Sequence, residues 1–406
     1  MIKKIKNILK EEFIRGSLVL LILFGIYNVK NYIFQFSMAR LLSPAEYAVL
    51  SALISLTYIF NIPSEPFQTL IVKYCSKYIK KNGKIKNLIY DYLKLGLIYS
   101  SLIYGVYLII SIFLRNILGI DYWLLALIGI LIFSAFITPI LRGAIQGIKK
   151  FKELGINLIL ESSIKLILGI ILVVSGMKVY GAVFGILLGF LAAVLFSLIP
   201  LKGIFKEKRL KEETEEKYGL KVFISMTALV LMSSLDVILA LALFKPEIAG
   251  QYSIASMLGK IIFFGTQAIG KAMFPLSSIS HEKGHSAEGI LKKALIFILV
   301  ISIVVLGLYW FFAEKVILFL FNTGYYHSLS LIMLVSLSFA LLSFTNILTL
   351  YYLSKKQEKR EYLMILLVLG YMFVAFIASK DIVRFAEIFL GFNILMFLYA
   401  IVLSRK

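Results

Sequence analysis

Seven charged residues lie inside long apolar segments of this 406-residue sequence, and they are its main candidates for chemistry. The seven are Lys30, Glu65, Glu161, Lys165, Asp236, Lys260 and Lys271. If the segments cross a membrane, each buried charge costs about 2.5–3.5 kcal/mol on insertion scales. Charges kept at that cost are expected to face a bundle interior, a water-filled cavity or an oppositely charged side chain.

Four of the seven lie at a similar depth. Each stands nine or ten residues from a residue at the predicted external side: Lys30 from Arg40, Lys165 from Ser175, Asp236 from Lys245 and Lys260 from Gly250. Ten residues of helix rise about 15 Å, which is half of a roughly 30 Å hydrocarbon core. We therefore expect these side chains to share one layer near the middle of the membrane, with three positive charges and one negative.

Two pairings would neutralise part of this layer. Asp236 could pair with Lys260, and Lys165 could pair with Glu161 one helical turn away. Neither pairing supplies a partner for Lys30. A water-filled cavity beside Lys30 is the simplest way to accommodate its charge, and a basic cavity favours an anionic ligand.

The segment around Lys30 is unusually polar, since it also contains Asn28, Asn31 and Gln35. This polarity supports a cavity at the same place. We predict five substrate-binding residues in a central cavity, namely Lys30, Asn31, Lys165, Lys260 and Asp236.

Glu65 suggests a second kind of chemistry. It stands between two prolines in Ile62–Phe67 (IPSEPF), inside an apolar run. Proline removes a backbone donor and bends a helix, which frees carbonyl oxygens. A carboxylate beside freed carbonyls resembles the sites that bind Na⁺ or a proton in transporters. We predict ion coupling at Glu65 and at Asp236; alternatively, Glu65 caps a kink or pairs with a loop residue such as Lys73.

The elements that position these residues must be membrane helices. The chain is 60% hydrophobic and 16% charged, with a mean hydropathy of +0.93, whereas average proteins are roughly a quarter charged. Only helices and closed barrels satisfy the backbone in lipid, and the apolar runs are long and continuous. We predict an all-α polytopic membrane protein with twelve spans at 17–37, 47–72, 95–114, 122–141, 155–175, 179–200, 222–243, 251–274, 294–313, 329–352, 362–379 and 384–403.

The net charge of +21 indicates how the chain is oriented in the membrane rather than binding to nucleic acid. Of the 43 Lys and Arg residues, 32 fall in the N-terminal segment and the alternate connections on its side, 7 in the opposite connections and 4 within spans. Loops rich in Lys and Arg remain on the cytoplasmic side of a membrane. We therefore predict a protein of the cell membrane with both termini in the cytoplasm. The single cysteine, Cys75, excludes an internal disulfide and a cysteine-cluster metal site. No cofactor is expected beyond a coupling Na⁺ or proton.

The polar connection 201–221 divides the chain into two halves of six spans. We predict an amphipathic segment on the cytoplasmic side at 1–16, an N-lobe at 17–200, the linker, and a C-lobe at 222–403. A weak internal repeat supports this division, because Pro44 and Pro246 follow the first span of each half. Within the N-lobe, three glycines spaced by four residues predict a smooth helix face for close packing: Gly181, Gly185 and Gly189.

Three stretches resemble the polysaccharide flippases of the multidrug/oligosaccharidyl-lipid/polysaccharide (MOP) exporter superfamily. They are Ala39–Leu53 (ARLLSPAEYAVLSAL), Leu141–Gly185 and Ala242–Ala255 (ALFKPEIAGQYSIA). In the second stretch, the turn motif R-G-x-x-Q-G-x-x-x-F is formed by Arg142, Gly143, Gln146, Gly147 and Phe151.

The resemblance implies a V-shaped, MATE-like pair of six-helix bundles that works by alternating access. It implies a polyprenyl phosphate- or pyrophosphate-linked oligosaccharide as cargo, moved from the inner to the outer leaflet, with the lysine layer holding the phosphate. We expect a monomer with membrane lipids as its other partners, and not an enzyme.

Two other functions stay open. A cation-coupled multidrug exporter of the same superfamily would favour acidic residues in its cavity, because its cargoes are mostly cationic. A membrane polysaccharide polymerase or ligase would need a large external loop with catalytic Arg, His or Asp residues. The longest external connection here, 314–328, is short.

Overall fold

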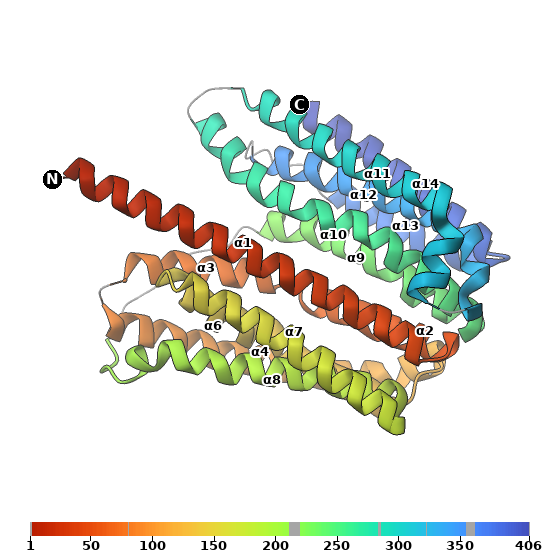
Figure 1. Ribbon diagram of the computed structural model, residues 1–406, viewed down its shortest axis with the longest axis horizontal. Helices are drawn as coiled ribbons and strands as arrows, with labels where there is room; N and C mark the ends of the chain where they lie inside the picture. The colour runs from red at the N-terminus through yellow and green to blue at the C-terminus, as the bar shows by residue number, and fades with distance from the viewer. Residues whose placement is uncertain are drawn as a thin grey trace. The chain divides into compact units, whose positions relative to one another are not determined.

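The computed structural model describes residues 2–79, 81–210, 220–282, 286–321, 323–354 and 362–405 (Figure 1). The regular structure of these residues is helical and includes no strand. The predicted all-α class is therefore confirmed. Helices are the expected solution for a chain of this composition, because every backbone donor and acceptor is satisfied within the segment itself.

The chain forms two compact units. The first comprises Met1–Leu41 and Phe60–Lys217, and the second comprises Leu42–Ile59 and Tyr218–Lys406. The segment Leu42–Ile59 thus groups with the C-terminal half of the chain, whereas the sequence-based division put it in the N-lobe. The predicted lobes at 17–200 and 222–403 stay a prediction.

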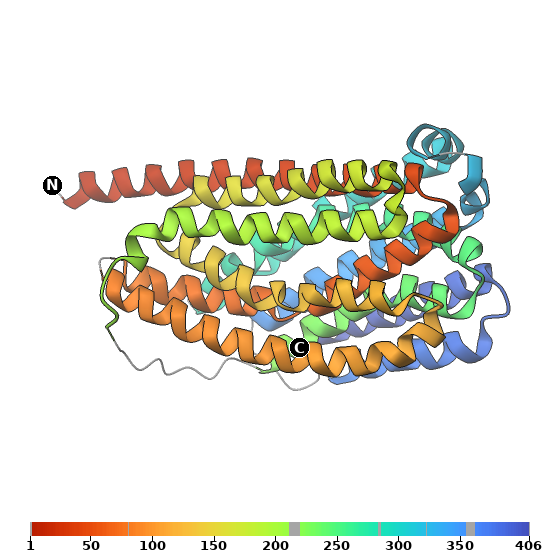
Figure 2. The ribbon, with the colours of Figure 1, turned by 90° about the horizontal axis from the view of Figure 1, so that it is seen from below.

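Seven α-helices form the first unit: α1 (Ile2–Leu41), α3 (Ser64–Lys77), α4 (Asn82–Leu118), α5 (Tyr122–Gly129), α6 (Ser134–Gly147), α7 (Phe151–Leu172) and α8 (Lys178–Phe205). A 3₁₀ turn (η1, Ile130–Ile132) joins α5 to α6, and a π-helical turn (η2, Val173–Met177) joins α7 to α8. α7 packs against both α1 and α8 (Figure 2).

The α7–α8 hairpin turns back over very few residues. Gly176 has a φ of 94° and Lys178 a φ of 48°, so the backbone enters the left-handed region twice. Glycine adopts this region without a steric cost, which explains its position at the turn. The two helices then run side by side along their length (Figure 1).

The predicted glycine face on α8 is confirmed. A Cβ added at Gly185 would lie 2.6 Å from the Cα of Gly169, and one at Gly189 would lie 2.8 Å from the carbonyl oxygen of Glu161. Neither neighbour is a flexible side chain, so the helices could approach this closely only with glycine. This approach holds α7, which carries Glu161 and Lys165, at a fixed distance from α8.

We expect Gly185→Val to destabilise the purified protein by about 1–3 kcal/mol, because the new side chain would force α7 and α8 apart. Thermal unfolding in detergent measures the change. Gly105→Val on α4 is the matched control, since a Cβ there meets no atom within 4 Å. Equal unfolding midpoints for the two variants would contradict the close approach.

The second unit contains the other α-helices: α2 (Pro44–Phe60), α9 (Leu220–Leu243), α10 (Pro246–Glu282), α11 (Glu288–Leu320), α12 (Leu329–Ser354), α13 (Tyr362–Ala378) and α14 (Ile382–Arg405). A short 3₁₀ segment, η3 (Thr323–Ser328), precedes α12. α12 is the central helix of this unit, because it packs against α10, α11 and α14.

α2 is attached to this unit by specific contacts. Its start is a capping box, in which the Ser43 N–H donates to the Glu46 carboxylate at 3.0 Å and the Glu46 N–H donates to the Ser43 hydroxyl at 3.3 Å. The buried Tyr47 hydroxyl then donates to the sulfur of Met257 on α10 at 3.1 Å. The prolines of the proposed repeat, Pro44 and Pro246, are the first residues of α2 and α10, a position that tolerates proline.

Two predicted segments differ from the structure. The span predicted at 47–72 is two helices, since α2 ends at Phe60 and α3 begins at Ser64. The segment predicted at 1–16 is not a separate helix, because α1 runs unbroken from Ile2 to Leu41. The side chains of the first 21 residues lie outside the described part of the structure, so their predicted amphipathic contact with the membrane stays a prediction.

The number of membrane crossings also stays a prediction. Among the described residues, nine helical stretches are long and apolar enough to cross a membrane. One of them, Phe151–Phe205, is the α7–α8 hairpin counted as a single stretch of 55 residues. A further apolar helix, Leu363–Ala378, falls below the length of the nine.

Candidate functional site

Lys30 and Lys165 lie together in the first unit, where α1 packs against α7. The Lys30 ammonium donates to the Ser163 hydroxyl at 2.6 Å, and the Lys165 ammonium donates to the side-chain oxygen of Asn31. The amide nitrogen of Asn31 donates to the Tyr27 carbonyl at 3.0 Å, so its oxygen is turned toward Lys165. Three of the five predicted binding residues therefore meet in one place.

Close packing of α1 and α7 brings these groups together. A Cβ added at Gly169 would lie 2.7 Å from the ring of Phe34, so glycine is needed where the ring approaches α7. The Lys165 ammonium lies 4.9 Å from the centroid of the same ring. A cation over an aromatic face gains about 0.5–2 kcal/mol, which partly offsets the cost of burying the lysine.

Arg142 extends this group of residues to α6. Its guanidinium forms an ion pair with Glu161 on α7 and donates through Nε to the Asn157 oxygen at 2.7 Å. Asn157 is fully buried and donates to the Ala193 carbonyl on α8 at 2.6 Å. The polar cluster of the first unit comprises Lys30, Asn31, Arg142, Asn157, Glu161, Ser163 and Lys165.

Lys165 and Glu161, one of the two pairs proposed from the sequence, form no direct ion pair, although the Glu161 carboxylate still attracts the charge of Lys165. Glu161 pairs with Arg142 instead, and Lys165 takes a neutral partner. A guanidinium offers several donors in a planar fork, and Arg142 uses this fork to reach Glu161 and Asn157 together. Arg142 was not among the predicted binding residues, because the predicted span ended at residue 141; the motif that begins at Arg142 was the available signal.

The polar cluster carries an excess of positive charge. It contains three cations and the single carboxylate of Glu161, and that carboxylate is paired. Lys30 and Lys165 are both partly buried and hydrogen-bonded to neutral oxygens. Within the part of the chain that the structure describes, no three or more His, Cys, Asp or Glu side chains could hold a metal ion. The arrangement thus suits an anion better than a cation.

The other two predicted binding residues lie in the second unit, where they pair with each other. The Lys260 ammonium lies 3.2 Å from the Asp236 carboxylate, which confirms that proposed pairing. The Ser256 hydroxyl donates to the second oxygen of Asp236 at 2.5 Å. Asp236 is fully buried and Lys260 is 7% exposed, so the pair is an internal, electrically neutral element of this unit.

Glu65 occupies a different environment from the one predicted. It is exposed in the first turn of α3, where the helix dipole favours a carboxylate. The preceding Ser64 hydroxyl donates to the Ala135 carbonyl on α6 at 3.1 Å, which anchors this end of α3 in the first unit. The proline pair therefore marks an interruption of the α-helix between Phe60 and Ser64, and an ion at Glu65 stays a prediction.

The sequence matches the family of polysaccharide biosynthesis proteins over residues 13–281, which is well over half of the chain. The chain belongs to the polysaccharide biosynthesis protein family. The matched region contains the polar cluster of the first unit as well as the Asp236–Lys260 pair.

The chain is also similar to an uncharacterized membrane protein of Methanocaldococcus jannaschii, with 23% identity over 239 residues. This similarity covers 55% of the chain and 56% of the relative, so the chain spans little more than half of that protein's length.

Two solved structures share the fold. An inward-facing multidrug resistance MATE family transporter of the MOP superfamily has a TM-score of 0.72 and 14% identity, over 94% of each chain. The lipid II flippase MurJ, in an inward closed conformation, has a TM-score of 0.70 and 16% identity, over 96% of this chain and 88% of that one. The expected resemblance to this superfamily and its MATE-like fold is confirmed.

This member of the polysaccharide biosynthesis protein family is therefore a multi-pass membrane protein with the fold of MOP superfamily transporters. The two solved structures with this fold are a transporter and a flippase; that this protein is not an enzyme stays a prediction.

Proposed function

We propose that this polysaccharide biosynthesis protein moves a lipid-linked oligosaccharide from the inner to the outer leaflet of the cell membrane by alternating access, as a monomer with both termini in the cytoplasm. The lipid is a polyprenyl phosphate or pyrophosphate. The observation that carries the proposal is the positive excess of the polar cluster, since phosphate is the one anionic group that every such cargo contains.

Lys30 and Lys165 are the residues best suited to contact that phosphate. Their partners, Ser163 and Asn31, are neutral, so exchanging them for a phosphate oxygen replaces a hydrogen bond to a neutral acceptor with a hydrogen-bonded ion pair. Arg142 is already committed to Glu161 and Asn157. It contributes to the local positive potential and holds α6 against α7.

Asp236 and Lys260 are less suited than Lys30 and Lys165 to bind the cargo. Lys260 can bind a phosphate only if its ion pair with Asp236 breaks, and breaking a buried pair costs several kcal/mol. We propose that the pair mainly maintains the second unit. For the same reason Asp236 is a poorer candidate than Glu65 for binding a coupling ion.

A cation-coupled multidrug exporter is the second candidate, and the observation in its favour is the likeness to the MATE family fold. A cationic drug would need uncompensated carboxylates. The polar cluster holds one carboxylate, and its charge is matched by Arg142. The charge balance of this cluster therefore favours an anionic cargo.

Leaflet-resolved transport in vesicles tests the proposal. The purified protein is reconstituted with a fluorescent polyprenyl-pyrophosphate-linked oligosaccharide, and an impermeant quencher reports how much label lies in the outer leaflet. We expect protein-dependent movement of the labelled lipid and no movement of ethidium, a cationic dye. Transport of ethidium without movement of the lipid-linked sugar would overturn the proposal in favour of the exporter.

We expect Glu65→Gln to remove the stimulation of transport by a Na⁺ or proton gradient, because the amide has no negative charge to neutralise a cation and no proton to take up and release. The measurement is the transport rate with and without each gradient. Glu247→Gln is the matched control, since Glu247 is also an exposed acid in the first turn of a helix. If the Glu65→Gln variant responds to the gradients as the wild type does, Glu65 does not take part in ion coupling.

A further inference from the structure

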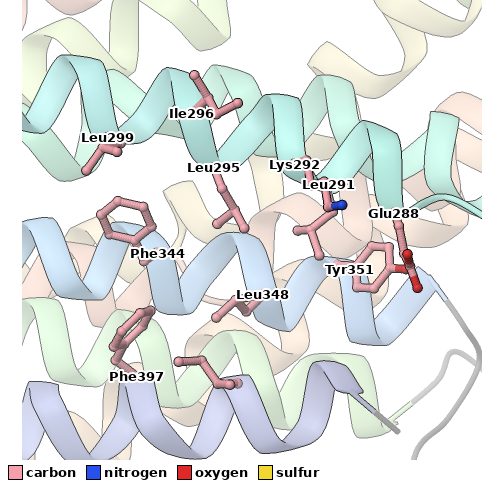
Figure 3. Close-up of a pocket in the computed structure, with 11 residues that line it drawn as sticks. Glu288, Leu291, Lys292, Leu295, Ile296, Leu299, Phe344, Leu348, Tyr351 and Phe397 are labelled. Atoms are coloured by element: carbon pink, nitrogen blue, oxygen red, sulfur yellow. The ribbon is translucent and has the colours of Figure 1, made fainter.

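The second unit contains an apolar groove of about 680 Å³ between α11, α12 and α14 (Figure 3). Eight of its eleven lining residues are Leu, Ile or Phe. The remaining three are Glu288, Lys292 and Tyr351. The groove lies entirely within the second unit, so it is separate from the polar cluster of the first unit.

The polar lining residues gather at one end of the groove. Figure 3 shows Glu288, Lys292 and Tyr351 together at this end, while Leu299, Phe344 and Phe397 line the other. The polar end coincides with the start of α11, which begins at Glu288. A groove with one polar end and an apolar body matches an amphiphile that has one headgroup and one hydrocarbon chain.

The length of the groove matches one leaflet. From Glu288 to Leu299, α11 rises by about 16 Å, and one half of the hydrocarbon core is about 15 Å thick. The polar end lies at the predicted cytoplasmic end of α11, so the groove would run from the inner surface to the middle of the bilayer.

The charge at the polar end favours an anionic headgroup. Lys292 lines the groove and Lys293 follows it, and both are exposed, against the single carboxylate of Glu288. A lysine on a long flexible stem reaches easily into the headgroup region. Each such lysine contributes about 1 kcal/mol toward an anionic lipid surface.

We propose that this groove binds one acyl chain of an anionic phospholipid of the inner leaflet, with the headgroup phosphate on Lys292. The apolar lining accepts the chain, the polar end receives the headgroup, and the positive excess selects the anionic lipid over a zwitterionic one. The site is independent of the proposed cargo, because none of its residues belongs to the polar cluster.

Quenching by brominated lipids tests this site in the whole protein. The two tryptophans, Trp123 and Trp310, are first replaced with phenylalanine. Phe397→Trp then reports from inside the groove, and Phe376→Trp reports from a side chain on α13 that is 74% exposed. The vesicles contain phosphatidylcholine with equal fractions of either brominated phosphatidylglycerol or brominated phosphatidylcholine, and no lipid-linked sugar.

We expect the groove reporter to prefer brominated phosphatidylglycerol by about 5-fold, which corresponds to about 1 kcal/mol, and the surface reporter to show no preference. Lys292→Gln should abolish the preference, whereas Lys315→Gln, near the other end of the same helix, should retain it. Equal quenching by the two lipids at position 397 would overturn the proposal. Each unbrominated lipid can also be added to displace the brominated lipid and so relieve the quenching at position 397. Stronger relief by polyprenyl phosphate than by phosphatidylglycerol would also overturn the proposal and assign the groove to the cargo's tail.

Discussion

Replacing Lys30 with alanine is expected to reduce transport of the lipid-linked oligosaccharide by about 10- to 100-fold, because a hydrogen bond to a charged group contributes about 1.5–3 kcal/mol. The protein's abundance in the membrane should not change. The partner of Lys30 is the neutral Ser163 hydroxyl, so the substitution leaves no unpaired charge behind. The leaflet-resolved vesicle assay measures transport, and immunoblotting of membranes measures abundance.

Two further variants separate the charge of Lys30 from its packing. Ser163→Ala removes the partner and keeps the ammonium, so we expect transport to persist. Lys245→Ala removes an exposed lysine outside the polar cluster and should leave transport unchanged. If Lys30→Ala transports at the wild-type rate, Lys30 does not contact the cargo and the proposed phosphate site loses its main support.

Replacing Lys260 with methionine is expected to destabilise the protein by about 3–5 kcal/mol, because it leaves the buried carboxylate of Asp236 without its countercharge. The remaining partner, the Ser256 hydroxyl, supplies only a hydrogen bond. Thermal unfolding of the purified protein in detergent measures the loss.

The double variant Asp236→Asn with Lys260→Met should recover most of that stability. A buried pair replaced as a whole by neutral groups is often close to neutral in free energy, whereas a broken pair is not. Ser256→Ala is the control and should cost only about 1 kcal/mol. A Lys260→Met protein as stable as the wild type would show that Asp236 does not depend on this countercharge.

The sequence by itself determined which segments are helical and which charges are costly. The predicted spans fall in helical parts of the structure, apart from the interruption between α2 and α3 inside 47–72, because long apolar runs in lipid must satisfy their backbone groups locally. The similar depth of Asp236 and Lys260 in their segments also made their pairing one of two proposed from the sequence, and this pair is present. These are consequences of composition and of the helical rise, and both can be read along the chain.

Only the tertiary structure decided which charges meet across helices. Glu161 has Lys165 one turn away on its own helix, yet it pairs with Arg142, which α6 brings against α7. The break at Ser64 and the grouping of Leu42–Ile59 with the second unit were likewise not predicted. The helical period reveals which face a residue occupies, but the partner depends on which helices pack at that face. That choice rests on contacts such as Gly169 against Phe34, which join residues far apart in the chain.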